Sequence, residues 1–87
     1  MPAISRFYGI TIGMWFNEHG VPHFHAEYAE YEASFSIESG APIAGADMPN
    51  RAKRMIEEWA KLHQRELLDN WDAARNRRAL RRIDPLP

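Results

Sequence analysis

The sequence predicts an α+β domain in which a three- or four-stranded antiparallel meander is packed on one face by a C-terminal helix or bent helix pair. Two observations lead to this prediction. Apolar and polar residues alternate in three stretches between positions 7 and 38, as in half-buried strands. From about position 49 the apolar residues recur at helical spacing instead. We expect one domain, with strands over about 7–45, a helical region over about 49–77 and a basic extended tail over 78–87.

Each predicted strand has its own run of alternating residues. The first runs from Phe7 to Phe16, and turn-forming residues at 17–22 separate it from the second. A third run follows with a short connection, which favours a meander, and Ile43-Ala44 is a candidate edge strand. The positions expected to face the helices share an apolar character and are Ile10, Ile12, Met14, Phe24, Ala26, Tyr28, Ala33, Phe35 and Ile37.

The inward positions also predict how the strands align, because opposed residues in antiparallel strands share a face. We expect Ile12 opposite Ala26 on one side and Phe35 opposite Ala26 on the other. This alignment predicts a two-residue turn at Glu30-Tyr31.

The helical region changes its apolar face along its length. Asp47 is a plausible N-cap for its start. Beyond residue 66 the apolar residues centre about a quarter turn away from the earlier stripe, which predicts two helices, or one bent helix, meeting near His63 to Glu66. We interpret Trp59 and Trp71 as core and interface anchors. The earlier stripe consists of Ala52, Met55, Ile56 and Trp59.

Composition narrows the class of protein. The 87 residues include no cysteine, which excludes disulfides, thiolate catalysis and cysteine-type zinc sites. No apolar run approaches the roughly 20 residues of a membrane span, and the N-terminal residues lack the apolar segment of a secretory signal. We therefore expect a cytoplasmic protein with no membrane contact.

Three of the four histidines lie within seven positions, and His23 and His25 are two residues apart, so their side chains point to the same side of a strand. We expect that side to face away from the helices, with Gly13 opposite His25 and nothing blocking access from solvent. His23 and His25, together with His19 or Glu27, could hold a divalent metal such as zinc. No other cofactor is expected.

Two further functions could use the same face. His23 and His25 could act as general acid and base in phosphodiester cleavage, since imidazole titrates near neutral pH. Alternatively, Trp15, the histidines and neighbouring carboxylates such as Glu27 could dock onto a partner protein.

Charge is segregated along the chain. Residues 1–48 carry one base and six acids, whereas residues 49–87 carry ten bases and six acids. The halves could attract one another within the fold or in a homo-oligomer. A run of arginines near the C-terminus favours contact with a partner protein, and binding of nucleic acid is the alternative. The run consists of Arg75, Arg77, Arg78, Arg81 and Arg82.

Several segments together resemble a family of short bacterial proteins classed as a domain of unknown function. They are Ile4-Ser5-Arg6-Phe7, Pro22-His23-Phe24-His25-Ala26-Glu27-Tyr28, Glu58-Trp59-Ala60 with Leu62-His63, and Asn70-Trp71. The resemblance implies a cytoplasmic partner-binding module, one component of a toxin–antitoxin-like two-gene system whose partner is encoded nearby. The resemblance assigns a catalytic role to no residue of this chain. A histidine- or metal-dependent RNase-like toxin is the first alternative, and a nucleic-acid-binding regulator using the arginine tail is the second.

Overall fold

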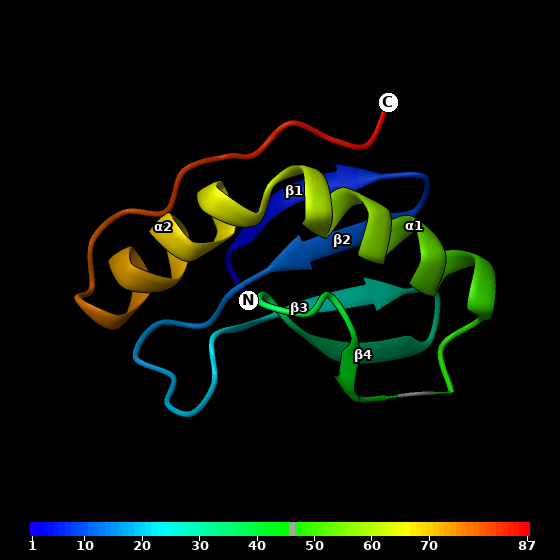
Figure 1. Cartoon of the computed structure of the whole chain (residues 1–87), viewed down its shortest axis with the longest axis horizontal. Coiled ribbons are helices and arrows are strands. Elements are labelled where there is room, and N and C mark those ends of the chain that lie inside the picture. The colour runs from blue at the N-terminus through cyan, green and yellow to red at the C-terminus, as the bar shows by residue number, and fades with distance from the viewer. Residues whose placement is uncertain (46) are drawn as a thin grey trace.

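A single antiparallel sheet and two helices on one of its faces form the fold (Figure 1). The computed structural model describes residues 1–45 and 47–87. Five strands lie in sequence order, so the α+β class is confirmed, whereas the expected three or four strands are too few. The elements are β1 (Ala3–Phe7), β2 (Ile10–Gly13), β3 (His23–Tyr28), β4 (Tyr31–Ser36), β5 (Pro42–Ala44), α1 (Asn50–Leu62) and α2 (Gln64–Arg75).

The additional strand is β1, which precedes the predicted start of the sheet. The expected strand from Phe7 to Phe16 is divided by a turn at Tyr8 and Gly9, which both have positive φ (49° and 81°). Phe7 then pairs with Ile10 in an antiparallel hairpin. The alternation in β1 is interrupted by a register shift between Ala3 and Ser5, so its period-2 signal is weak.

The predicted alignment is confirmed on one side of β3 and wrong on the other. Ile12 lies opposite Ala26, as expected. Phe35 pairs with Phe24 instead of Ala26, and the turn falls at 29–30, between the paired Tyr28 and Tyr31. The shift is two residues, so every side chain keeps its predicted face.

The core lies between the helices and the predicted inward face of the sheet. Trp59 of α1 is fully buried, and its ring centroid lies 5.4 Å from that of Phe7 and 5.8 Å from that of Phe24. Met55 is partly buried at the edge of this cluster. The largest fully buried apolar side chains are Trp59, Phe24, Phe35, Ile4, Ile10, Ile12, Met14, Ile37, Met48, Ile56 and Leu67.

The two helices meet at His63, which confirms the predicted change of face. The backbone N–H of His63 donates to the Trp59 carbonyl, and its ring Nδ1 lies 2.6 Å from a Glu66 carboxylate oxygen. The predicted N-cap at Asp47 is wrong, because α1 begins at Asn50 with Pro49 in the N-cap position. Neither helix in the described residues is both long and apolar enough to cross a membrane.

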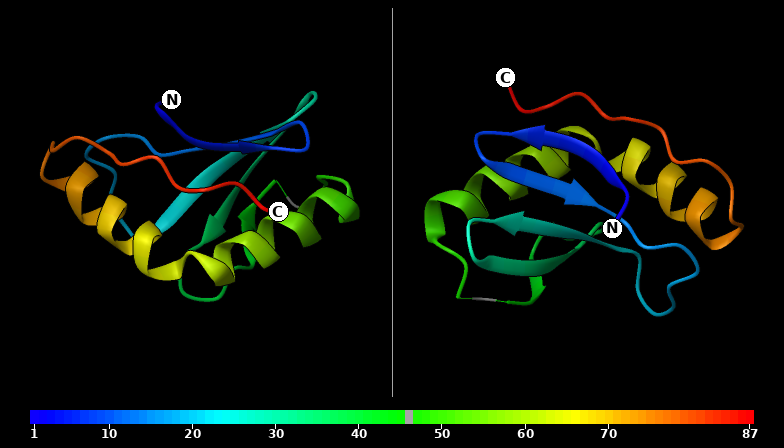
Figure 2. Two further views of the ribbon diagram at one scale, coloured as in Figure 1. Left: turned by 90° about the horizontal axis from the view of Figure 1, so that it is seen from above. Right: turned by 180° about the vertical axis from the view of Figure 1, so that it is seen from behind.

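The C-terminal segment, residues 76–87, runs back beside β1 at the edge of the sheet, as Figures 1 and 2 show. It has no helix or strand, yet it is attached to the rest of the domain. The Ile83 side chain is 3% exposed, and its backbone N–H donates to the Ile4 carbonyl at 2.8 Å. The Trp59 indole N–H donates to the Asp84 carbonyl at 2.8 Å. The end of the segment therefore belongs to the core.

Candidate functional site

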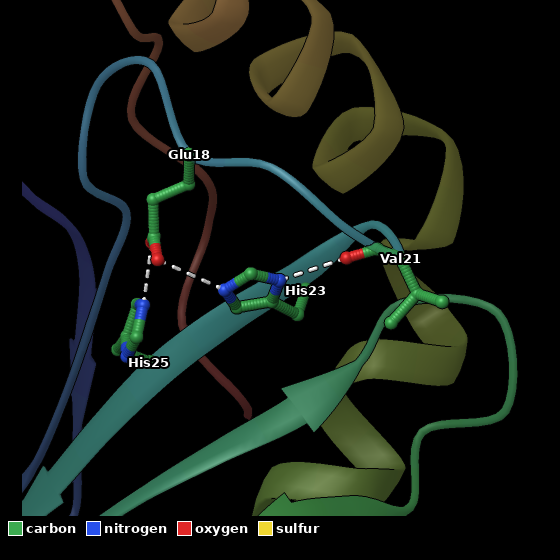
Figure 3. Close-up of polar contacts among 4 residues, drawn as sticks. All are labelled: Glu18, Val21, His23 and His25. Carbon is green, nitrogen blue, oxygen red and sulfur yellow. Dashed lines mark hydrogen bonds and ion pairs between the residues drawn. The ribbon is translucent and has the colours of Figure 1, made fainter.

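His23, His25 and Glu18 meet at the start of β3 (Figure 3). The histidines are the first and third residues of that strand, so they share the face opposite to the buried Phe24. Glu18 comes from the loop of residues 14–22, the β2–β3 loop, which folds back so that its carboxylate reaches both rings. We call these three residues the His–Glu cluster.

One carboxylate bridges the two imidazoles. The Nε2 atom of His25 lies 2.6 Å from one Glu18 oxygen, and the Nε2 atom of His23 lies 3.2 Å from the other. The second ring nitrogen of His23, Nδ1, donates to the Val21 carbonyl oxygen at 2.8 Å. Burial by itself raises the pKa of the Glu18 carboxyl, but the hydrogen bonds and charges of His25 and His23 outweigh it and lower the pKa below its ordinary value.

The cluster is half-buried, which corrects the expectation of freely accessible imidazoles. The exposed fractions of the side chains are 13% for His23, 26% for His25 and 28% for Glu18. Helix α2 extends past the end of the sheet where β3 begins (Figure 1), and the Trp71 ring lies 5.0 Å from that of His23. The loop is fixed to the same helix by a hydrogen bond from the Asn17 N–H to the Ala74 carbonyl.

Gly13 lies opposite His25, as predicted, but it leaves no opening to solvent. The N-terminal residues lie against it: a Cβ placed at Gly13 would overlap the Pro2 carbonyl oxygen and the Met1 side chain. The Met14 N–H donates to that same carbonyl at 3.2 Å. A pocket on this side of the sheet is lined by Met1, Trp15, His25, Ala26, Glu27 and Glu32.

The predicted metal ligands are brought together only in part. Each residue of the His–Glu cluster offers one ligand atom, and these atoms all lie within 4.8 Å of one another. His19 is exposed and stands outside the group that the described residues form. Glu27 is paired across the sheet with Glu32 and is likewise outside it. The sequence does not predict Glu18 as a member of the cluster, because its position depends on the path of the β2–β3 loop, which no local pattern indicates.

The remaining predicted binding residues lie on the surface. Trp15 is 49% exposed. All five arginines of the C-terminal run are exposed, and Arg78 forms an ion pair of 2.6 Å with Asp72. Arg77 lines a shallow pocket together with Phe16 and Asn17, so the arginine run and the β2–β3 loop adjoin each other.

These features define a small α+β domain whose candidate site is a His–Glu cluster beside an exposed aromatic loop. The chain belongs to the family described as a domain of unknown function (DUF4160), whose model matches residues 9–72. The matched region contains the whole cluster and ends just after Trp71, before the arginine run. Searches of curated proteins and of solved structures gave no match.

Proposed function

We propose that the protein is a partner-binding module, one component of a toxin–antitoxin-like two-gene system, and that it contacts its partner through the β2–β3 loop and the arginine run. The observation that carries the proposal is the concentration of exposed apolar side chains on this loop. Trp15, Phe16 and Val21 are 49%, 44% and 60% exposed, although they occupy only seven consecutive positions. Exposed aromatic residues beside charged ones are typical of interface anchors.

The backbone conformation at Arg77 also supports a binding role for this surface. The end of α2 is closed by two hydrogen bonds, from the Arg78 N–H to the Ala73 carbonyl at 2.7 Å and from the Arg77 N–H to the Ala74 carbonyl at 3.2 Å. In this type of helix ending the residue in the position of Arg77 has positive φ and is usually glycine. Arg77 has a φ of 55°. An arginine at a position that favours glycine costs stability, which is a mark of a functional constraint.

The chemistry of this surface indicates the chemistry of the partner. Phe16 and Arg77 line one pocket, so a partner segment that combines an apolar side chain with a carboxylate would fit it. A second copy of the chain is an alternative occupant, because the N-terminal half is rich in acids. Measurement of the mass in solution separates the two, since only self-association raises the mass of the isolated protein.

The direct test is co-purification with the product of the neighbouring gene, followed by calorimetric titration. Trp15→Ala and Arg77→Gly should each weaken binding at least about tenfold, as expected for interface anchors. The Arg77→Gly variant is informative because it removes the side chain without straining the backbone. Matched controls are Leu62→Ala, at a residue 61% exposed on α1, and Arg54→Ala, at an exposed arginine of the same helix. Equal effects of the controls and the loop variants, or no complex at all, would refute the proposal.

Truncation of the arginine run is a poor test, because it also removes a core residue. A chain that ends at Arg75 lacks Ile83 and the carbonyl of Asp84 that accepts from Trp59. Loss of binding would then follow from loss of folding. Point substitutions in the run avoid this.

A metal- or histidine-dependent RNase-like toxin is a second candidate, favoured by the His–Glu cluster itself. Two imidazoles joined by one carboxylate could take up and return a proton at a phosphodiester. This candidate predicts RNA cleavage or growth inhibition that His25→Ala abolishes and His63→Ala preserves. If the wild-type protein shows neither activity, the candidate is rejected. Binding of uncleaved RNA that decreases with Arg81→Ala and with added salt would favour the regulator alternative instead.

A further inference from the structure

We propose that Glu18, His23 and His25 bind one divalent transition-metal ion, with zinc as the expected occupant, through a carboxylate oxygen and the two Nε2 atoms. Partner binding by the β2–β3 loop does not require a metal, so this inference goes beyond the proposed function. It depends on the distances within the His–Glu cluster, on the orientation of His23 and on the chemistry of the three donors.

The distances are close to those of a zinc site. Zinc ligands lie about 2.0–2.2 Å from the ion in a tetrahedral arrangement, which places any two ligand atoms roughly 3.4 Å apart. His23 Nε2 lies 3.2 Å from one Glu18 oxygen and His25 Nε2 lies 2.6 Å from the other, and one ligand atom from each of the three residues lies within 4.8 Å of the other two. Binding therefore requires the carboxylate to withdraw from His25 and to turn one oxygen toward the ion that both rings face. Glu18 lies on a loop, so it is the ligand best placed to make this adjustment.

His23 is oriented as metal-binding histidines are. Its Nδ1 faces the Val21 carbonyl oxygen, which can only accept a hydrogen bond, so Nδ1 carries the proton. In the neutral ring Nε2 then presents its lone pair toward a Glu18 oxygen that is also an acceptor. Two acceptors that face each other need a cation or a second proton between them. A backbone carbonyl that holds the other ring nitrogen is the usual outer partner of a metal-binding imidazole.

The surroundings hold the histidines in place before any ion arrives. The Trp71 ring packs against His23, and the two imidazoles form a T-shaped pair with 5.2 Å between ring centroids. His25 is fixed by its position in β3, where it pairs with Gly13 and Ser34. Because both rings are held by these contacts, little ordering of the histidines is needed on binding.

The donor set selects the metal. Imidazole nitrogen suits zinc and neighbouring transition metals, whereas magnesium and calcium prefer sites built from oxygen. Three protein ligands leave a fourth position for water or for a group from another molecule, as in zinc sites that are not closed. The second His–Glu pair of the chain, His63 and Glu66, has the same 2.6 Å contact but a single imidazole, so it provides a natural control.

The test is a titration of the chelator-treated protein with zinc chloride alone, followed by calorimetry and by the NMR signals of the four histidine rings. We expect one equivalent of zinc per chain and changes in the His23 and His25 signals, with those of His19 and His63 unchanged. The Tm measured in a thermal melt should rise with zinc, because an ion that binds only the native state stabilises that state. Zinc binding that is weak and unsaturated, or that moves the His19 or His63 signals instead, would overturn the proposal.

Matched variants identify the ligands. Glu18→Gln and His25→Ala should each weaken zinc binding by at least about tenfold, whereas His19→Ala and His63→Ala should change it less than about twofold. Glu18→Gln keeps the shape of the side chain and changes a half-exposed group, so it should fold normally, which circular dichroism checks. Equal losses in all four variants would overturn the assignment. Because no partner is present in these titrations, their failure leaves the proposed partner binding untouched.

Discussion

Replacement of Ile83 by alanine tests whether the C-terminal segment is part of the folded core. The side chain is 3% exposed and lies in the same cluster as Trp59. Its backbone N–H donates to the Ile4 carbonyl, and that hydrogen bond survives the substitution. Isoleucine to alanine in a core loses the transfer free energy of the removed carbons and leaves a cavity, at a total cost of about 2–5 kcal/mol. Because the segment lies at the edge of the sheet, we expect the lower part of this range, about 2–3 kcal/mol.

The free energy of unfolding is measured by urea denaturation followed by tryptophan fluorescence. Trp59 is a direct reporter, because its indole N–H is bonded to the Asp84 carbonyl next to the altered residue. For a domain of this size the expected loss lowers Tm by roughly 10 °C or more. Leu62→Ala is the control: its side chain is 61% exposed, and the change should stay within about 0.5 kcal/mol. If Ile83→Ala is no worse than Leu62→Ala, the segment does not pack as described.

Three further substitutions test other contacts by the same measurement. Asn70→Ala should cost about 1–3 kcal/mol, because Asn70 both donates to the Arg81 carbonyl and accepts from the Arg81 N–H; a neutral result would show that this reciprocal pair is not formed. Gly13→Ala should cost about 1–3 kcal/mol through overlap with the Pro2 carbonyl, and an unchanged Tm would mean that the N-terminal residues lie elsewhere. Arg77→Gly should instead raise stability by about 1 kcal/mol, since glycine adopts the positive φ of 55° without strain, and a loss would contradict the described helix ending.

Much of the fold could be predicted because the pattern that encodes it is local. The alternation around Ile12 and Phe24 identifies the buried face of each strand without knowledge of its neighbours. The change of apolar face near His63 likewise located the break between α1 and α2. Strand β1 is not predicted from the sequence, because its buried Ser5 and its register shift disturb the alternation of apolar and polar residues.

The errors concern turns and segments whose positions depend on distant contacts. The turn between β3 and β4 begins at Ala29 with a φ of 52°, a conformation that alanine does not favour and that composition does not reveal. The attachment of residues 76–87 depends on Ile4 and Trp59, which lie far away in sequence.

The sequence predicts that the two histidines of the candidate site share a face, but it does not predict that Glu18 joins them. The shared face of His23 and His25 follows from strand geometry alone. Glu18 joins them only because the β2–β3 loop folds back and is fixed to α2 at Asn17, a path that sequence spacing does not determine. His19, its neighbour in sequence, is therefore exposed and apart from the site.

The position of Met1 has a practical consequence for handling the protein. Met1 lines the same pocket as His25, so anything fused ahead of it begins next to the His25 imidazole. A hexahistidine purification tag attached there would place additional nitrogen donors close to His25, and these donors would compete for any ion whose affinity is measured. Pro87 is exposed at the other terminus, and a removable tag joined to it keeps those donors away from the N-terminal pocket.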